Sequence, residues 1–116
     1  MSGWCARAVL FVADIDHAAD FYVRQLGFAE AWRHQDSGRA LVVQVERDGC
    51  ELILSSQQPE KTGHGMMFIS LNRAVFDALR AELGGKGVDV KEGHWGYRVL
   101  IIEDPDGNQL YFPVPD

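Results

Sequence analysis

Alternating apolar and polar residues predict two groups of strands in this chain, each interrupted by one helical pattern. In the first half, strands are expected at residues 6–12, 28–34, 40–46 and 50–55. In the second half, they are expected at residues 66–71, 88–91, 97–103 and 108–112. Short turn-rich sequences separate neighbouring strands: QDSG, RDG and, most distinctly, DPDG at residues 104–107, where Pro suits the first corner and Gly supplies positive φ.

Helical spacing replaces the alternation at two places. The first helix is expected to start at Asp14 or Asp16 as cap and to end at Gly27, which suits a left-handed position. Its buried stripe would contain Ala18, Phe21, Tyr22 and Leu26. The second helix is expected over residues 74–83, with a stripe of Val75, Leu79 and Leu83 and with Gly84 and Gly85 as its stop.

This order is βαβββ, repeated once, and it predicts an α+β fold with curled mixed sheets around a cleft and helices outside. We expect one domain over residues 1–116, with modules at 5–56 and 64–113 joined by a polar linker at 57–63. One helix covers one face of each sheet, so the other face needs a partner. That partner is either the second module or a second chain.

Side-chain parity divides each strand between a cleft face and a helix face. The cleft face would contain Arg7, Val9, Phe11, Glu51, Ile53, Ser55, His64, Met66, Phe68, Ser70, Gln109 and Tyr111. The opposite parity, for example Met67, Ile69 and Leu71, is more uniformly apolar and suits packing under a helix. Cys5 falls on the cleft side and Cys50 on the helix side, so no disulfide between them is expected.

Composition narrows the function classes. The chain has 116 residues, is 47% hydrophobic and carries a formal net charge of -6, as an ordinary globular domain would. An acidic chain of this kind does not suit nucleic-acid binding, and no apolar run reaches the length of a membrane span. We therefore expect a cytoplasmic protein whose ligand is a small molecule.

Several short motifs resemble the vicinal oxygen chelate superfamily, which includes glyoxalase I, extradiol dioxygenases and bleomycin-resistance proteins. The motifs are Val12-Ala13-Asp14, Phe21-Tyr22, Leu26-Gly27-Phe28 and the DPDGN sequence at residues 104–108. The WGYR sequence at residues 95–98, leading into DPDGN, looks most like the bleomycin-resistance proteins. The resemblance covers nearly the whole chain.

In its metal-dependent branches, the resemblance implies His or Gln on the first strand, Glu on the fourth, His on the fifth and Glu on the eighth. The corresponding positions here are Arg7, Ile53 with Glu51 two residues away, His64 or Met66, and Tyr111. A guanidinium would repel a cation, and only Glu51 and His64 could serve as ligands. We therefore expect no metal, no other cofactor and no catalytic residue; the alternative is one divalent metal ion. The DPDG corner is then interpreted as structural.

The candidate ligand-binding residues are Arg7, Phe11, Trp32, Glu51, His64, Phe68, Trp95, Tyr97 and Tyr111. Arg7 either clamps an anionic group or pairs with Glu51, and these two roles are compatible. His64, next to two glycines, is either a solvated loop residue or a ligand. The aromatic residues either form the walls of a site for a flat molecule or pack in a dimer interface.

The leading hypothesis is a metal-free binding protein that forms a homodimer and sequesters a small aromatic or cationic molecule in a composite cleft. One alternative is a divalent-metal-dependent lyase or dioxygenase using Glu51 and His64. The other is a structural or interaction module with an empty cleft.

Overall fold

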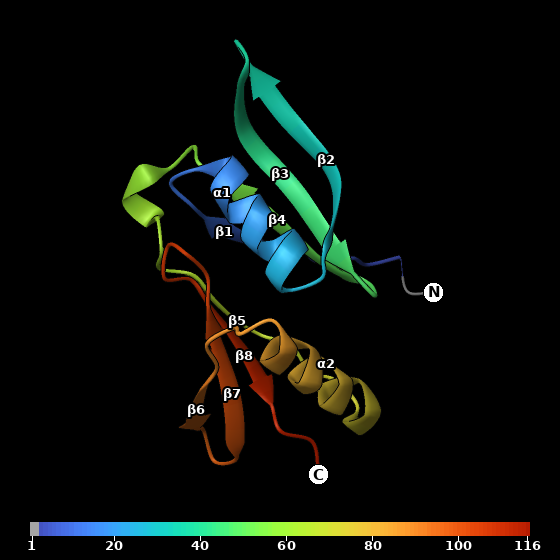
Figure 1. Ribbon diagram of the computed structural model, residues 1–116. Coiled ribbons are helices and arrows are strands. Elements are labelled where there is room, and N and C mark those ends of the chain that lie inside the picture. The colour runs from blue at the N-terminus through green and yellow to red at the C-terminus, as the bar shows by residue number, and fades with distance from the viewer. Residues whose placement is uncertain (1–2) are drawn as a thin grey trace.

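The computed structural model describes residues 3–116 and has the α+β architecture of two βαβββ modules (Figure 1). The first two residues of the expected domain lie outside the described part. The first module contains β1 (Ala8–Phe11), α1 (Ile15–Asp20), η1 (Phe21–Gln25), β2 (Ala29–Asp36), β3 (Arg39–Arg47) and β4 (Cys50–Ser55). After η2 (Pro59–Lys61), the second module contains β5 (Met66–Phe68), α2 (Arg73–Gly85), β6 (Lys91–His94), β7 (Arg98–Glu103) and β8 (Gln109–Pro113).

The two sheets have the same topology. Their strand orders are β1-β4-β3-β2 and β5-β8-β7-β6, in which β1 and β4, and β5 and β8, run parallel and all other neighbours run antiparallel. Figure 1 shows the modules end to end, with the β2–β3 hairpin projecting beyond the body of the first. Extents of 48 × 36 × 26 Å describe the same elongated shape. Within residues 3–116, no helix is long and apolar enough to cross a membrane.

Local chemistry sets the boundaries of the first module. Asp14 caps α1, because its Oδ1 accepts a hydrogen bond from the backbone N–H of His17 at 3.0 Å. The expected single helix instead continues from residue 21 as the π-helical turn η1. Ser37-Gly38 and Asp48-Gly49 form tight hairpin turns with positive φ at both residues, as type I′ turns require.

In the second module, three element boundaries differ from those predicted from the sequence. Helix α2 includes Gly84 and ends at Gly85, with Lys86 as its C-cap, so the residue with positive φ after the helix is Gly87. Phe76 and Leu83 are the buried residues of α2, whereas Val75, expected on the stripe, is 41% exposed. Strand β5 ends at Phe68 rather than at residue 71, and β6 lies at 91–94 rather than at 88–91.

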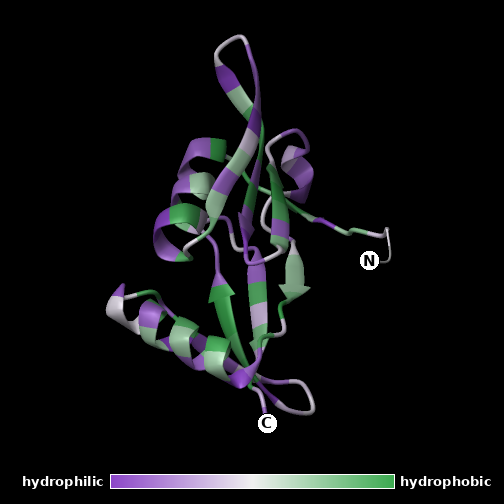
Figure 2. Ribbon diagram, turned by 90° about the vertical axis from the view of Figure 1, so that its right-hand side faces the viewer, coloured by the Kyte–Doolittle hydropathy of each residue, from purple (hydrophilic) through white to green (hydrophobic). Residues whose placement is uncertain are grey.

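The hydrophobic core lies between the sheets and the helices. Leu52 and Leu54 of β4, Val43 of β3 and Leu110 of β8 are fully buried on the helix side, as the parity argument expects. Figure 2 shows that the helices alternate between hydrophobic and hydrophilic residues, which is typical of helices that cover one face of a sheet. The sheets do not close on each other within the chain.

A buried polar network in the DPDGN sequence joins the modules. The Asp104 carboxylate accepts hydrogen bonds from the Tyr22 hydroxyl at 2.9 Å and from the Asn108 side-chain amide at 2.9 Å. Asn108 also donates to the Phe11 carbonyl at 3.0 Å, and its Oδ1 accepts from the Gly65 N–H at 2.7 Å. Burial, and then the charge of Asp104, raises the pKa of Tyr22 well above its usual range. The corner is therefore structural, as its sequence suggested.

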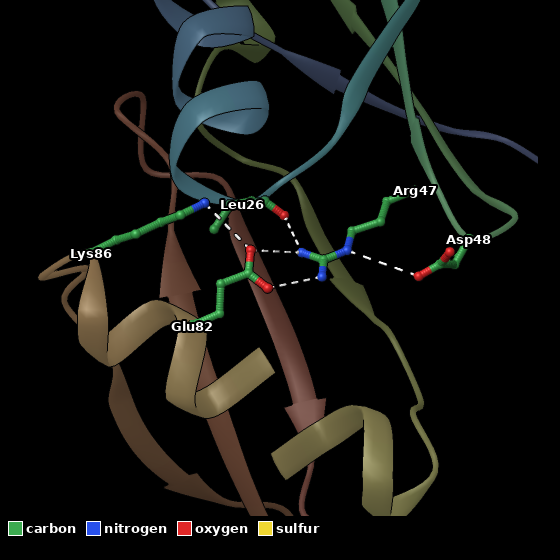
Figure 3. Close-up of polar contacts among 5 residues, drawn as sticks. All are labelled: Leu26, Arg47, Asp48, Glu82 and Lys86. Atoms are coloured by element: carbon green, nitrogen blue, oxygen red, sulfur yellow. Dashed lines mark hydrogen bonds and ion pairs between the residues drawn. The ribbon is translucent and has the colours of Figure 1, made fainter. Parts of the chain in front are cut away.

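An ion-pair cluster joins the modules at a second place (Figure 3). Arg47, at the end of β3, donates through Nη1 to the Leu26 carbonyl at 2.7 Å and through Nη2 to Oε2 of Glu82 in α2 at 3.0 Å. Lys86 lies 3.3 Å from the other Glu82 oxygen. The hydrogen bond from Arg47 lowers the pKa of Glu82 below its usual range. Together, the two networks fix how the modules are placed within one chain.

Candidate functional site

The sheet face opposite α1 holds one group of candidate residues, which we call the first face: Arg7, Val9, Phe11, Trp32, Gln44, Glu51 and Ile53. The strand register places Val9 beside Ile53, Ile53 beside Gln44, and Gln44 beside Trp32. Because neighbouring residues in register share a face, this row crosses all four strands. Val9 is 44% exposed and Trp32 is 46% exposed, so the row is open to solvent.

Polar contacts orient the ends of this row. Trp32 donates through its indole N–H to the Gln44 side-chain oxygen at 2.8 Å. At the opposite edge, Arg7 Nε lies 2.8 Å from Glu51 Oε2, which is the ion pair weighed from the sequence. The Cys5 thiol also lies 3.6 Å from this Glu51 oxygen, and both cysteines are free thiols. Glu51 is therefore held by a cation and a weak donor on the first face.

The sheet face opposite α2 holds the other group, which we call the second face: Met66, Phe68, Trp95, Tyr97 and Tyr111. Phe68 and Tyr111 are paired in register on the parallel strands β5 and β8. Their rings stack at 5.0 Å with an interplanar angle of 22°. Trp95 packs edge-on against both rings, at 5.1 Å from Phe68 and 5.5 Å from Tyr111. These three rings form an aromatic cluster from two strands and the loop after β6, which are distant in the sequence.

The aromatic cluster is partly open. Tyr111 is 6% exposed, whereas Phe68 is 37% and Trp95 is 52% exposed. The Tyr111 hydroxyl lies 3.1 Å from the Gln109 side-chain oxygen, and Trp95 is held by a backbone hydrogen bond to the Tyr97 carbonyl at 2.9 Å. The cluster can therefore present an aromatic wall without first rearranging.

Two candidates lie at the margins of these faces. His64 is exposed directly after the linker, and its backbone N–H donates to the Lys61 carbonyl at 3.3 Å. Tyr97 is 49% exposed between β6 and β7. Neither belongs to the aromatic cluster.

Two contacts were not predicted from the sequence. Gln44 is 6% exposed beneath Trp32 on an otherwise apolar strand, and this polar residue in an apolar run was an available signal. Lys61 lies over the Phe11 ring, with Nζ 5.4 Å from the centroid. No local pattern indicates that contact, because Lys61 belongs to the polar linker.

The residues at the positions that bind metal in related branches do not fit a metal ion. Glu51 already pairs with the Arg7 guanidinium, and Tyr111 packs its ring on Phe68. In the described part of the chain, no three His, Cys, Asp or Glu residues are grouped as metal ligands.

Comparison with known proteins identifies the class. The family model of the Glyoxalase/Bleomycin resistance protein/Dioxygenase superfamily matches residues 4–112, and the chain belongs to this superfamily. No curated protein matches the chain.

Similar solved structures refine this placement. TnmS3, an antibiotic-binding protein from Streptomyces sp. CB03234, is 25% identical with a TM-score of 0.77, over 100% of this chain and 99% of that chain. A glyoxalase/bleomycin resistance protein from the same strain is 26% identical with a TM-score of 0.75, over 95% and 99%. The bleomycin-binding protein from Streptomyces verticillus, solved with copper(II)-bleomycin, is 22% identical with a TM-score of 0.73, over 100% and 99%. That last likeness shows the fold alone.

Proposed function

We propose that this protein is a cytoplasmic, metal-free binding protein that sequesters a small aromatic or cationic molecule without converting it. The observation that carries the proposal is the aromatic cluster of Phe68, Trp95 and Tyr111 on a sheet face that no helix covers. Flat aromatic walls bury a planar ligand over a large contact area. The remaining candidates, Arg7, Phe11, Trp32, Glu51, His64 and Tyr97, would complete the site.

The proposed site is composite and belongs to a homodimer. Within one chain, both the first face and the second face are open, and the modules lie end to end (Figure 1). A second copy could place its second face opposite the first face of its partner, and the reverse, which makes a symmetric pair of clefts. This arrangement would cover the exposed apolar residues of both faces.

The net charge of the chain and its similarity to known structures support a small aromatic or cationic ligand. The net charge of -6 favours the approach of cations, and exposed Trp faces bind cationic groups. TnmS3, a similar structure, is described as an antibiotic-binding protein, and this supports an antibiotic-like small molecule as the ligand that we propose here.

The contact between Arg7 and Glu51 favours binding over metal chemistry. A divalent cation at Glu51 would have to displace a guanidinium whose Nε lies 2.8 Å from the carboxylate. Instead, the pair offers a donor and an acceptor to the polar edge of a flat ligand. We propose that Arg7 and Glu51 orient the ligand in this way, while the aromatic residues supply most of the contact area.

Tryptophan fluorescence tests this function directly. The protein would be titrated with metal-free bleomycin and with a panel of planar antibiotics, in the presence and absence of a chelator. Saturable quenching is expected for at least one compound, with the same curve in both conditions. Trp95→Phe should weaken that binding about tenfold or more, since it removes an exposed ring of the cluster. The matched control Trp4→Phe changes a Trp that is 92% exposed and is not one of the candidate residues, and it should bind normally.

The outcomes separate the hypotheses. The binding proposal would be overturned by two results together: stoichiometric metal in protein purified without chelator, and a change in the mass of a test compound after incubation with the protein. These results would support a lyase or dioxygenase. Failure of every compound to quench would favour an interaction module. Sedimentation velocity at micromolar concentration should show a dimer, and a monomer would contradict the composite site.

A further inference from the structure

A pocket lies on the other side of the sheets from the two open faces, where the modules meet beside α2. Its volume is about 150 Å³. Its wall includes Leu26 and Phe28 of the first module and Leu71, Leu79, Ile102 and Phe112 of the second. Four of these residues, Leu26, Phe28, Ile102 and Phe112, are nearly fully buried. The pocket is therefore built partly from core residues of both modules, and loop residues between β5 and α2 complete its wall.

The charged groups at the pocket rim are already paired with one another (Figure 3). Arg47 and Asp48 line the pocket, and Arg47 is held by Glu82 and by the Leu26 carbonyl. With Lys86 bound to Glu82, this group contains two cations and two anions, so its formal charge is zero. A charged ligand would have to break one of these pairs. The rim therefore favours a neutral occupant.

Volume and lining define the occupant further. A pocket of about 150 Å³ whose wall is mostly Leu, Ile, Val and Phe has room for one benzene-sized ring, and this part of the wall offers water few hydrogen-bond partners. We propose that this pocket is a second ligand site, distinct from the composite cleft, for a small neutral molecule with a single apolar ring. The site uses the segment after β5 together with β7, β8 and α2, and it does not depend on the dimer.

Cys50 provides a reporter inside the pocket. This residue starts β4, lines the pocket and is partly buried. Burial raises the pKa of its thiol, so Cys50 should react slowly with alkylating reagents. An occupant of the pocket would cover the thiol and slow the reaction further. The exposed Cys5 would be removed by Cys5→Ser, so that only Cys50 reports.

The experiment measures the rate of Cys50 alkylation by iodoacetamide, followed by mass spectrometry, with increasing benzene. For a single site, the rate should fall by the factor 1 + [benzene]/Kd, or about sixfold at five times the Kd. Val75→Phe enlarges a pocket residue that is 41% exposed on α2. It should slow alkylation without benzene and abolish the further protection. The matched control Val23→Phe adds the same volume at a position that is 36% exposed on η1 and lies outside the pocket, and it should change neither rate.

Three results would overturn the proposal. They are an alkylation rate that benzene does not change, equal protection in the Val75→Phe protein, and protection seen only at protein concentrations where a dimer forms. If the thiol proves inert throughout, methyl NMR replaces the reaction. Benzene must then shift the Ile102 and Leu79 methyl resonances saturably, and unshifted resonances would exclude the site.

Discussion

Replacing Tyr22 by Phe isolates one hydrogen bond between the modules. The Tyr22 side chain is fully buried, and its hydroxyl donates to Asp104 at 2.9 Å. Phenylalanine would keep the edge-to-face contacts with Phe21 at 5.5 Å and Phe28 at 5.9 Å. The change therefore removes a hydrogen bond to a buried carboxylate and little else.

The expected cost follows from the partners that remain. Hydrogen bonds to charged groups contribute about 1.5–3 kcal/mol, and Asp104 would still accept from the Asn108 amide and from two backbone N–H groups. Because the carboxylate is not left unpaired, we expect a loss of about 2 kcal/mol in the free energy of unfolding. With about 2.1 cal/mol/K of unfolding entropy per residue, this corresponds to a Tm lower by roughly 8 °C for 116 residues.

Urea unfolding at one protein concentration measures this change, with Tyr97→Phe as the matched control. The concentration must be fixed because dimerisation would contribute to apparent stability. Tyr97 is 49% exposed, so its variant should unfold within about 0.5 kcal/mol of the wild type. If the two variants were equally stable, the bond between Tyr22 and Asp104 would not help to hold the modules together.

Three further predictions concern the same junctions. Because the folded-state pKa of Glu82 lies below its ordinary value of 4.5, its contact with Arg47 stabilises the protein above about pH 4.5 and is lost as pH falls through the lower folded value. Glu82→Gln should therefore destabilise the protein in urea at pH 7, and this difference should shrink as the pH falls below about 4.5. Because the pKa of Tyr22 is raised, stability should begin to fall above about pH 10, where the unfolded tyrosine ionises, and Tyr22→Phe should remove this contribution. Gly27→Ala should cost about 1 kcal/mol more than Gly38→Ala in thermal unfolding: both glycines have positive φ, but only at Gly27 would a Cβ lie 2.6 Å from Arg47 Nη1. Equal losses for the two alanine variants would contradict that packing.

The sequence was sufficient to predict the module order and the faces of the strands. Alternation with period two is a local property, and the register of β1 against β4 follows once both strands bury their apolar side. The contact between Arg7 and Glu51 was accessible for the same reason, since both residues belong to one face of neighbouring strands.

Other features depend on contacts that no local pattern specifies. Val75 fits a helical stripe as well as Phe76 does, and only the packing of α2 decides that Phe76 is buried. Gly84 and Gly85 suit the position just after a helix, but both belong to the last turn of α2, which has Lys86 as its C-cap. The edge-on packing of Trp95 against Phe68 and Tyr111 joins a loop to two strands, so the sequence indicated these residues without predicting the cluster.

The proposed composite cleft requires two chains, because one chain supplies the first face and its partner supplies the second. Subunit mixing tests this requirement most directly. Trp32→Ala changes the first face and Trp95→Ala changes the second, so each homodimer alone should have two defective clefts. A mixed dimer would place both substitutions in one cleft and leave the other intact. After subunit exchange at equal concentrations, fluorescence titration with a compound that quenches the wild type should recover about a quarter of its binding capacity. No recovery in a mixture shown to contain mixed dimers would contradict the composite site.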